Sequence, residues 1–220
     1  MEKTPQIDID SLKEQIKGEE GQAITEINVL FLDVSSNCTG YSICNINFHN
    51  KNAKLLKAGA IWFDPNWSHA DKYSYIFHAI VTYFWIVEKV DYIVVEQYSI
   101  NPKKMAGVHV VPEMMGVIKA AANENGIKVD SILPQSWRKI LGIKKEGDDW
   151  KVPTKKKVLE TVPNIPEESV SNVTNNTRRT PFDLYDAVAI GMAWLNKMGF
   201  PNLDTSQVEF NPHIGHDIGN

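Results

Sequence analysis

Four carboxylates stand at positions where a folded core would not ordinarily hold a charge. Asp33 interrupts the apolar run that begins at Val29, and Glu96 ends a second apolar run. Asp183 and Asp186 are three residues apart in a helical pattern, so they share a helix face. Taken alone, that pair also fits the first turn of a helix, where the helix dipole favours acids. A carboxylate is rarely buried unless it is paired or binds a metal ion, so Asp33 needs a partner.

Convergence of the four acids on one spot would supply that partner. Carboxylates so close together cannot all ionise without compensation, and a pair of divalent cations is the usual one. A set of oxygen donors without His or Cys indicates Mg²⁺, with Mn²⁺ as a substitute, and two ions per active site. Two ions about 3.5 to 4 Å apart can activate a water and stabilise the leaving oxygen of a phosphodiester. The predicted chemistry is hydrolytic cleavage of a nucleic-acid strand.

Three strands joined by short turns are expected to hold Asp33. Apolar and β-branched residues predict strands over 27–34, 41–48 and 55–63, with Thr39 and Gly40 in the first turn. Next we expect a helix over 71–90, a strand over 91–96 and a helix over 102–125 that is kinked at Pro112. A strand over 127–133 and helices over 134–141 and 154–162 should follow, with Thr154 as the cap of the second helix. The last segments are a loop excursion over 163–180 and a helix over 183–198.

This order of elements predicts an α/β fold. Three antiparallel strands followed by parallel ones give a mixed five-stranded sheet with helices on both faces. We expect an N-terminal arm over 1–26, one domain over 27–198 and an irregular tail over 199–220. The apolar face of the helix over 71–90, which includes Phe84 and Val87, should pack on the sheet.

The composition is that of a soluble, folded protein. The chain has 220 residues, of which 43% are hydrophobic and 23% charged. Its beginning lacks the pattern of a secretory signal, and the most apolar stretch, 76–95, is too polar to span a membrane. We therefore expect an intracellular, cytoplasmic protein without a membrane partner, in which Cys38 and Cys44 are free thiols.

The charge is distributed unevenly along the chain. The net charge is −4, yet eight basic residues face three acidic ones between Arg138 and Lys157. Arg178 and Arg179 form a second basic point. Such a run is either a solvated surface or a contact with nucleic acid, and its composition alone does not decide between them.

Four segments in order resemble the RuvC family of Holliday-junction resolvases, in particular its bacteriophage branch, within the ribonuclease H-like superfamily. No single segment carries the resemblance, which covers 27–197. The segments are Phe31-Leu-Asp-Val-Ser with Thr39-Gly-Tyr, Val94-Val-Glu-Gln97, the stretch from Leu133 to Gly142 with Lys155-Lys-Lys157, and Asp183-Leu-Tyr-Asp-Ala-Val-Ala-Ile190.

The resemblance implies a Mg²⁺-dependent crossover junction endodeoxyribonuclease that works in DNA recombination and repair. It implies a homodimer that binds a four-way DNA junction and nicks two opposing strands; for a phage protein this happens in the host cytoplasm. The catalytic, metal-binding acids of the family fall on Asp33, Glu96, Asp183 and Asp186. The resemblance also favours a DNA contact for the basic run, with Arg138, Lys139, Lys155, Lys156 and Lys157 as DNA-binding residues.

One position departs from the family pattern. Cellular resolvases have an aromatic residue three positions after the glutamate, where this chain has Ser99. Tyr98 precedes it and is a candidate for stacking against DNA, or else faces the core. The strictness of the junction specificity depends on this point.

Three other functions fit parts of the sequence. A nuclease of the same fold that cuts flaps or forks would use the same acids. An actin-like or sugar-kinase-like ATPase shares the pattern Asp-x-Ser-x-x-x-Thr-Gly that starts at Asp33, but it needs a second domain and a second glycine-rich loop. A DNA-structure binder without activity has no need of the acids.

Smaller candidates receive plain interpretations. Trp62 and Trp194 lie in apolar periodic segments and should pack in the core, whereas Trp150, in the basic loop, could contact DNA. His213 and His216 have a metal-ligand spacing, but their Gly, Pro and Asn neighbours favour an incidental tail.

Overall fold

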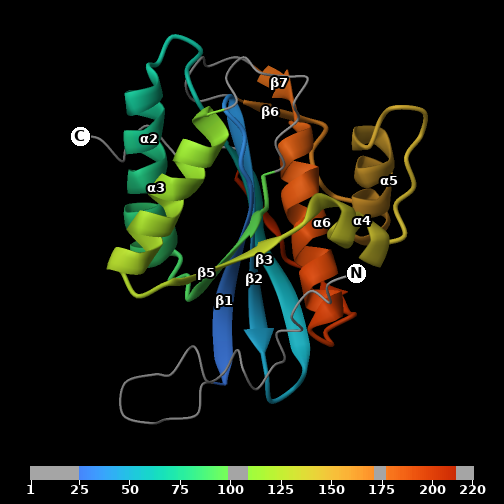
Figure 1. Cartoon of the computed structure of the whole chain (residues 1–220). Helices are drawn as coiled ribbons and strands as arrows, with labels where there is room; N and C mark the ends of the chain where they lie inside the picture. The colour runs from blue at the N-terminus through green and yellow to red at the C-terminus, as the bar shows by residue number, and fades with distance from the viewer. Residues whose placement is uncertain (1–24, 99–108, 171–176, 212–220) are drawn as a thin grey trace, which may run out of the picture.

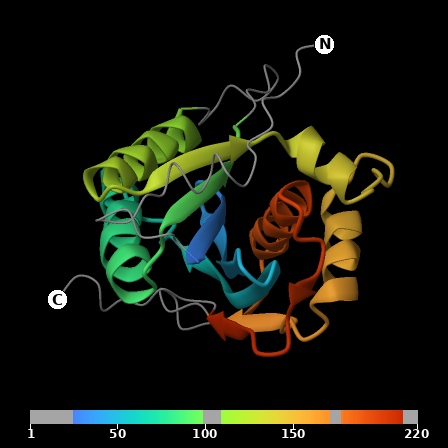
Figure 2. The same cartoon turned by 90° about the horizontal axis from the view of Figure 1, so that it is seen from below.

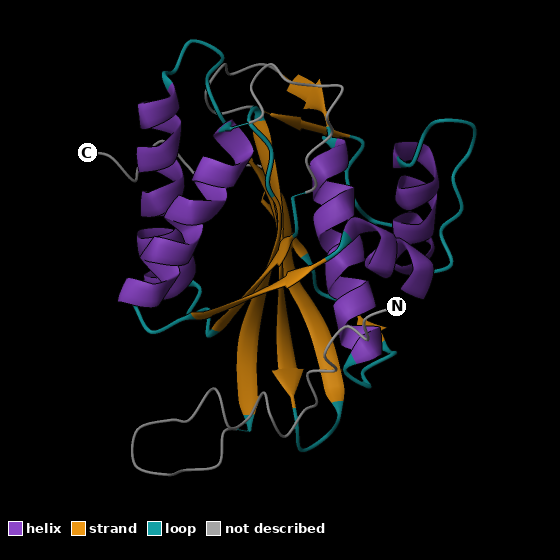
Figure 3. Ribbon diagram, in the orientation of Figure 1, coloured by secondary structure: helices purple, strands orange, loops and turns teal. Residues whose placement is uncertain are grey.

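The computed structural model describes residues 25–98, 109–170 and 177–211. The predictions for most of the N-terminal arm, for the start of the helix over 102–125, and for His213 and His216 lie outside these residues. In the described part, helices cover both faces of one twisted sheet (Figures 1 and 3).

The sheet has the predicted mixed topology. Its strand order is β5-β4-β1-β2-β3-β8, and β9 also pairs with β3. The strands β1, β2 and β3 are antiparallel, whereas β4 runs parallel to β1 and β5 parallel to β4. The bounds are β1 (Glu26–Asp33), β2 (Cys38–Asn47), β3 (Asn52–Trp62), β4 (Tyr92–Glu96), β5 (Lys128–Ile132), β8 (Leu203–Asp204) and β9 (Glu209–Asn211).

The last two strands correct the expectation of an irregular tail. Both are short, and both pair parallel to the outer edge of β3. Two or three residues without alternating apolar side chains carry little strand signal of their own. The unpaired backbone groups of β3 provide their partners, so the strands form only in the tertiary context.

The helices form two separate layers. On one face lie α2 (His69–His78), the π-helix η2 (Ala79–Val87) and α3 (Val110–Glu124). The opposite face is covered by α4 (Pro134–Ile140), α5 (Lys151–Thr161) and α6 (Phe182–Lys197), as Figures 1 and 2 show. A small hairpin, β6 (Glu168–Val170) and β7 (Thr177–Arg179), lies near the start of α6.

Alternation along β1 divides the core into two halves. Phe31 packs into the cluster that includes Trp194 of α6, while its neighbours Leu30 and Leu32 pack into the cluster of α2, η2 and α3. Successive side chains of a strand point to opposite faces, so Asp33 continues the series of Phe31. The same rule applies to β4, where Val94 belongs to the α6 side, and Glu96 follows in its series. Both acids are thus directed to the face that α6 covers.

Small residues let α6 lie very close to β2. A Cβ atom on Gly40 would lie 1.9 Å from the carbonyl oxygen of Asp183. Further along, the Ser42 hydroxyl donates to the Ala187 carbonyl oxygen at 3.1 Å. A Cβ atom on Gly191 would approach the Phe31 ring to 3.0 Å. Close packing at these points fixes where the start of α6 meets the sheet.

The turn after β1 is shorter than predicted. The second strand begins at Cys38, so Thr39 and Gly40 are strand residues rather than turn residues. The Ser35 hydroxyl donates to the Cys38 carbonyl oxygen at 2.7 Å, and the buried Lys72 ammonium donates to the Ser36 carbonyl oxygen at 2.9 Å. These bonds complete the turn before Thr39 is reached.

The predicted helix over 71–90 is α-helical only in its first half. From Ala79 to Val87 it is a π-helix, in which the backbone bonds span five residues instead of four. Ile76, Ile80 and Phe84 are buried as expected, but Val87 is 59% exposed. The wider turn moves Val87 away from the face that packs on the sheet.

Several predicted boundaries also move. Helix α5 starts at Lys151, not at Thr154, because the Asp149 carboxylate accepts the Lys151 N–H at 2.8 Å. Pro112 lies in the first turn of α3, where a missing N–H is harmless, so it causes no kink. The excursion over 163–180 contains the β6–β7 hairpin.

Two further observations concern the cysteines and the apolar helices. Cys38 and Cys44 are both buried, and no disulfide joins them. None of the helices in the described ranges is long and apolar enough to cross a membrane.

Candidate active site

The four predicted acids come together at one end of the sheet. Asp33 ends β1 and Glu96 ends the adjacent parallel strand β4, where Leu32 and Val95 are register partners. Asp183 and Asp186 lie in the first two turns of α6, which begins at this same end (Figure 1). Gly40, the register partner of Asp33, touches the backbone of Asp183. The sheet register and the seating of α6 therefore bring together residues 150 positions apart.

The two strand acids share an environment that opposes their ionisation. Burial raises the pKa of Asp33 well above its ordinary value, and the charges of Glu96, Asp186 and Asp183 raise it further. Burial also raises the pKa of Glu96, although Arg138 partly offsets the effect. Two carboxyls that share a hydrogen bond need a proton or another cation between them.

The two helix acids are perturbed in the same direction. Burial, followed by the charge of Glu96, raises the pKa of Asp186 to about 7. Burial likewise raises the pKa of Asp183, and a hydrogen bond from its own backbone N–H and the charge of Lys151 partly offset this. Four neighbouring carboxyls with raised pKa values form a site that lacks positive charge.

A cavity of about 190 Å³ opens beside these acids. Asp33 and Glu96 line it together with Tyr98, which is half-buried against the α3 side of the core. The Tyr98 ring therefore lines the cavity beside the acids and also packs against the core, while its stacking against DNA stays a prediction.

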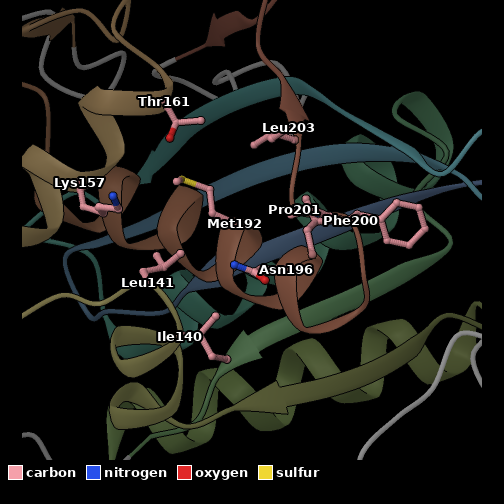
Figure 4. Close-up of a pocket in the computed structure, with 10 residues that line it drawn as sticks. Ile140, Leu141, Lys157, Thr161, Met192, Asn196, Phe200, Pro201 and Leu203 are labelled. Carbon is pink, nitrogen blue, oxygen red and sulfur yellow. The ribbon is translucent and has the colours of Figure 1, made fainter.

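A larger cavity, about 290 Å³, lies elsewhere, between α4, α5, α6 and the segment that leads to β8 (Figure 4). Most of the residues that line it are apolar, and Ile140, Met192 and Phe200 are among them. The four acids do not line it. Size alone would favour this cavity, but the acid cavity holds the groups that could do chemistry.

Arg138 is the predicted DNA-binding residue that lies nearest to the acids. Its guanidinium lies 3.9 Å from Glu96 Oε1, and the rings of Trp137 and Trp150 lie 4.5 and 5.2 Å from it. Trp194 is buried in the core, as expected, whereas Trp62 is only half-buried and lies outside both core clusters. Trp150 is half-buried under Arg138.

The predicted lysines lie in different surroundings. The Lys155 ammonium lies over the Tyr185 ring, 5.2 Å from the ring centroid. Tyr185 directly precedes Asp186 in the sequence. Lys156 pairs with Glu146 at 3.2 Å, and Lys157 pairs with Glu160 at 2.6 Å and lines the larger cavity (Figure 4). Lys139 is exposed on α4. Their part in DNA binding stays a prediction.

Three residues near the acids were not singled out as site residues from the sequence. Gly40 permits the approach of α6, Ser35 lies beside Asp183, and Lys151 lowers the pKa of Asp183 and Asp186. A glycine or serine in a turn, or one lysine within a basic run, gives no distinct signal before the tertiary contacts are known.

The donor chemistry suits hard divalent cations. Every acid in the cluster offers carboxylate oxygens, and their raised pKa values mean that added positive charge would be favourable there. Among the described residues, however, no three His, Cys, Asp or Glu side chains already surround a common point closely enough to hold an ion. The acids are close enough for their charges to interact, but they are not arranged as a finished coordination sphere.

The turn between β1 and β2 does not resemble an open phosphate loop. Thr39 is fully buried within β2, and the Gly40 backbone is covered by Asp183. A phosphate-binding loop needs its backbone N–H groups exposed to the ligand. This geometry weighs against the ATPase alternative.

The mixed sheet with this strand order has a ribonuclease H-like fold. Acids end its first and fourth strands and lie at the start of its last long helix. By sequence, the chain matches no protein-family model and none of the curated proteins. By structure, it matches Holliday-junction resolvases at low sequence identity.

Three solved structures illustrate the match. RuvC of Thermus thermophilus in complex with a Holliday-junction substrate gives a TM-score of 0.58 at 16% identity, over 79% of this chain and 98% of its own. The fowlpox virus Holliday-junction resolvase gives a TM-score of 0.53 at 10% identity, over 77% of this chain and 99% of its own. The yeast mitochondrial Holliday-junction resolvase Ydc2 gives a TM-score of 0.51 at 15% identity, over 87% of this chain and 86% of its own. Similarity at this level confirms the predicted fold class.

Proposed function

We propose that this protein is a metal-dependent, structure-specific endonuclease of the RuvC family, from its phage branch, that resolves four-way DNA junctions. The observation that carries the proposal is the cluster of Asp33, Glu96, Asp183 and Asp186, whose pKa values are all raised, at one end of a ribonuclease H-like sheet. Such a cluster destabilises a fold unless it serves to gather cations. Resolvases with the same fold support branched DNA as the substrate.

The acids would hold two Mg²⁺ ions, with Mn²⁺ as a substitute. When bound, the ions would activate a water and stabilise the leaving oxygen of a phosphodiester. The chain's own part is to hold its carboxylates ionised and in position. Lys151 stabilises the charge of Asp183, and Arg138 stabilises the charge of Glu96. Arg138 and Lys155, with Lys139, Lys156, Lys157 and Tyr98, are the proposed DNA contacts.

Cleavage of defined substrates tests this function. With Mg²⁺, we expect the purified protein to place paired, symmetric nicks in opposing strands of a synthetic four-way junction, and none with EDTA. A flap and a linear duplex serve as comparison substrates. Equal cutting of the flap would favour the broader branched-DNA nuclease. Junction binding without cleavage of any substrate in Mg²⁺ or Mn²⁺ would indicate a non-catalytic binder and contradict the proposal.

We also propose that the active form is a homodimer. Each chain carries one acid cluster, and two opposing strands cut in a coordinated way require two clusters. Light scattering during size-exclusion chromatography should therefore give twice the mass of one chain at the protein concentration that supports symmetric nicking. A monomer with full, paired cleavage would contradict this prediction.

A further inference from the structure

The larger cavity is surrounded by apolar side chains that the fold leaves only partly covered. Its volume is about 290 Å³, and it lies between α4, α5, α6 and the segment that leads to β8 (Figure 4). Ile140 and Leu141 at the end of α4, Met192 on α6 and Leu203 in β8 are half-buried in its wall. Burial of apolar surface is favourable, so an apolar group that covered these side chains would stabilise the fold.

The described part of the chain begins next to this cavity. Thr25 precedes β1, and its carbonyl oxygen accepts the Phe48 N–H at 2.9 Å. The Phe48 ring packs edge-on against the Phe200 ring, with the ring centroids 6.2 Å apart, and Phe200 lines the cavity. Residues 1–24, the N-terminal segment, lie outside the described residues. They join the fold at Thr25, which is one hydrogen bond and one ring contact away from the cavity wall.

The sequence of the N-terminal segment has an apolar pattern that suits such a surface. Leu12 and Ile16 are four positions apart, which is the spacing of one helix face, and Ile9 precedes Leu12 by three positions. The run Ser11-Leu-Lys-Glu14 matches a capping box, which is typical of a helix start. A helix this short is marginal in water on its own, so the pattern needs an apolar surface on which to bury its face.

Reach and charge both favour the larger cavity as that surface. The eight residues from 17 to 24 can span at most about 29 Å when extended, which is ample for a wall so close to Thr25. Lys157 lines the cavity and gives it positive charge, whereas the N-terminal segment has an excess of acids. Its acids are Glu2, Asp8, Asp10, Glu14, Glu19 and Glu20, and its bases are Lys3, Lys13 and Lys17.

We propose that the cavity between α4, α5 and α6 is the docking site of the chain's own N-terminal segment, with Leu12 and Ile16 as the side chains that fill it. The docked segment covers the half-buried apolar residues of the wall and ties α4 and α5 to α6. The four acids do not line this cavity, so the inference does not rest on the proposed function.

Cross-linking in the full chain tests the docking. The variant Lys13→Cys/Asn196→Cys has one thiol in the N-terminal segment and one at an exposed position of α6 that lines the cavity. A short-reach bismaleimide should join these thiols within one chain, since Cys38 and Cys44 are buried and do not compete. The matched control is Lys13→Cys/Lys119→Cys, whose second thiol is exposed on α3 in the opposite helix layer. It should give no intrachain product.

Thermal melting measures what the apolar face contributes. We expect Leu12→Gln and Ile16→Gln each to lower Tm by about 2 to 6 °C, because each removes one apolar side chain from the cavity. Lys13→Gln introduces the same side chain at a neighbouring position off the apolar face, and it should melt with the wild type. Leu12→Gln, added to Lys13→Cys/Asn196→Cys, should reduce the intrachain product at least fivefold.

The outcomes separate the possible occupants of the cavity. An intrachain product in the α6 variant alone, which Leu12→Gln reduces, supports docking of the N-terminal segment. A product that joins two chains would assign the cavity to a second copy and overturn the proposal. Equal intrachain yields in the α6 and α3 variants would overturn it as well. The same holds if Leu12→Gln changes neither Tm nor the yield.

Discussion

Asp186→Asn is expected to abolish Mg²⁺-dependent nicking and, at the same time, to stabilise the metal-free protein at pH 8. Loss of one shared ligand should lower the cleavage rate by on the order of 10³-fold or more, since bound metal ions supply several kcal/mol of transition-state stabilisation. The stability gain follows from the raised pKa of Asp186, about 7, because an amide in its place carries no charge to be repelled by Glu96. A site built for function is thus a source of instability until its cations bind.

The sign of the pH effect follows from that raised pKa. Below about pH 4 the Asp186 carboxyl is protonated in both the folded and the unfolded chain, so it imposes no penalty. Between about pH 4 and pH 7 the unfolded chain loses the proton while the folded chain keeps it. The free energy of unfolding of the wild type then falls by on the order of 1 kcal/mol per pH unit, and it levels off above pH 7.

Melting curves at pH 5 and pH 8, in EDTA and in Mg²⁺, measure this effect. In EDTA the variant should melt above the wild type at pH 8 by a margin larger than at pH 5. Addition of Mg²⁺ should raise the melting temperature of the wild type more than that of the variant. Glu124→Gln, an exposed acid at the end of α3, is the control and should show neither effect. A variant that melts below the wild type at pH 8 in EDTA would contradict the idea of a repulsive acid cluster.

The general fold could be predicted because local and long-range signals agree. Strand β1 alternates between two apolar faces, so Asp33 stands out as a charge in the series of Phe31. Strand β4 ends on Glu96 in the same way. Two strands that each end in an acid on the same face already indicate one shared site, and the pairing of β1 with β4 confirms that the strands are adjacent. That the acids bind metal ions and catalyse cleavage stays a prediction.

Other features depend on contacts that no local pattern reveals. The run from Ala79 to Val87 is apolar or aromatic at every position but Thr82, so its sequence fits an α-helical period as well as the observed π-helix. Asp149 and Thr154 are both of a residue type that accepts hydrogen bonds at a helix start. In the folded chain Trp150 is the N-cap residue, and the Asp149 carboxylate accepts the Lys151 N–H. The Thr154 hydroxyl instead donates to the Trp150 carbonyl oxygen within the helix. Because these bonds place Lys151 at the helix start, its position beside Phe182 could not be read from the sequence.

Gly40 is the clearest case of a residue whose role appears only in three dimensions. A glycine after Ser, Asn and Thr is typical of a turn, and the sequence favoured that interpretation. In the structure it lies within β2, opposite Asp33, and its missing side chain makes room for the backbone of α6. The residue that it accommodates, Asp183, lies more than 140 positions further along the chain.

Gly40→Ala should therefore have the largest effect of any single methyl group added near the site. The new Cβ atom would lie 1.9 Å from the Asp183 carbonyl oxygen, 2.1 Å from its carbonyl carbon and 2.7 Å from the Leu184 nitrogen. All three are backbone atoms, so no side chain can rotate away, and α6 must move off the sheet. We expect a loss of about 3 kcal/mol in the free energy of unfolding, at the upper end for an overpacked core.

The displacement should harm cleavage beyond its cost in stability, because it moves Asp183 and Asp186 away from Asp33. A shift of about 1 Å among catalytic groups can lower a rate about 100-fold, and we expect at least that loss in single-turnover nicking at a temperature where the variant is folded. The control is Gly116→Ala in α3, an exposed helical position with no atom within 4 Å of the added Cβ. It should gain about 0.5 to 1 kcal/mol in urea denaturation and nick at the wild-type rate. If Gly40→Ala has wild-type stability and cleavage, the contact between Gly40 and α6 does not fix the position of the helix. Another contact would then hold Asp183 and Asp186 near Asp33 and Glu96.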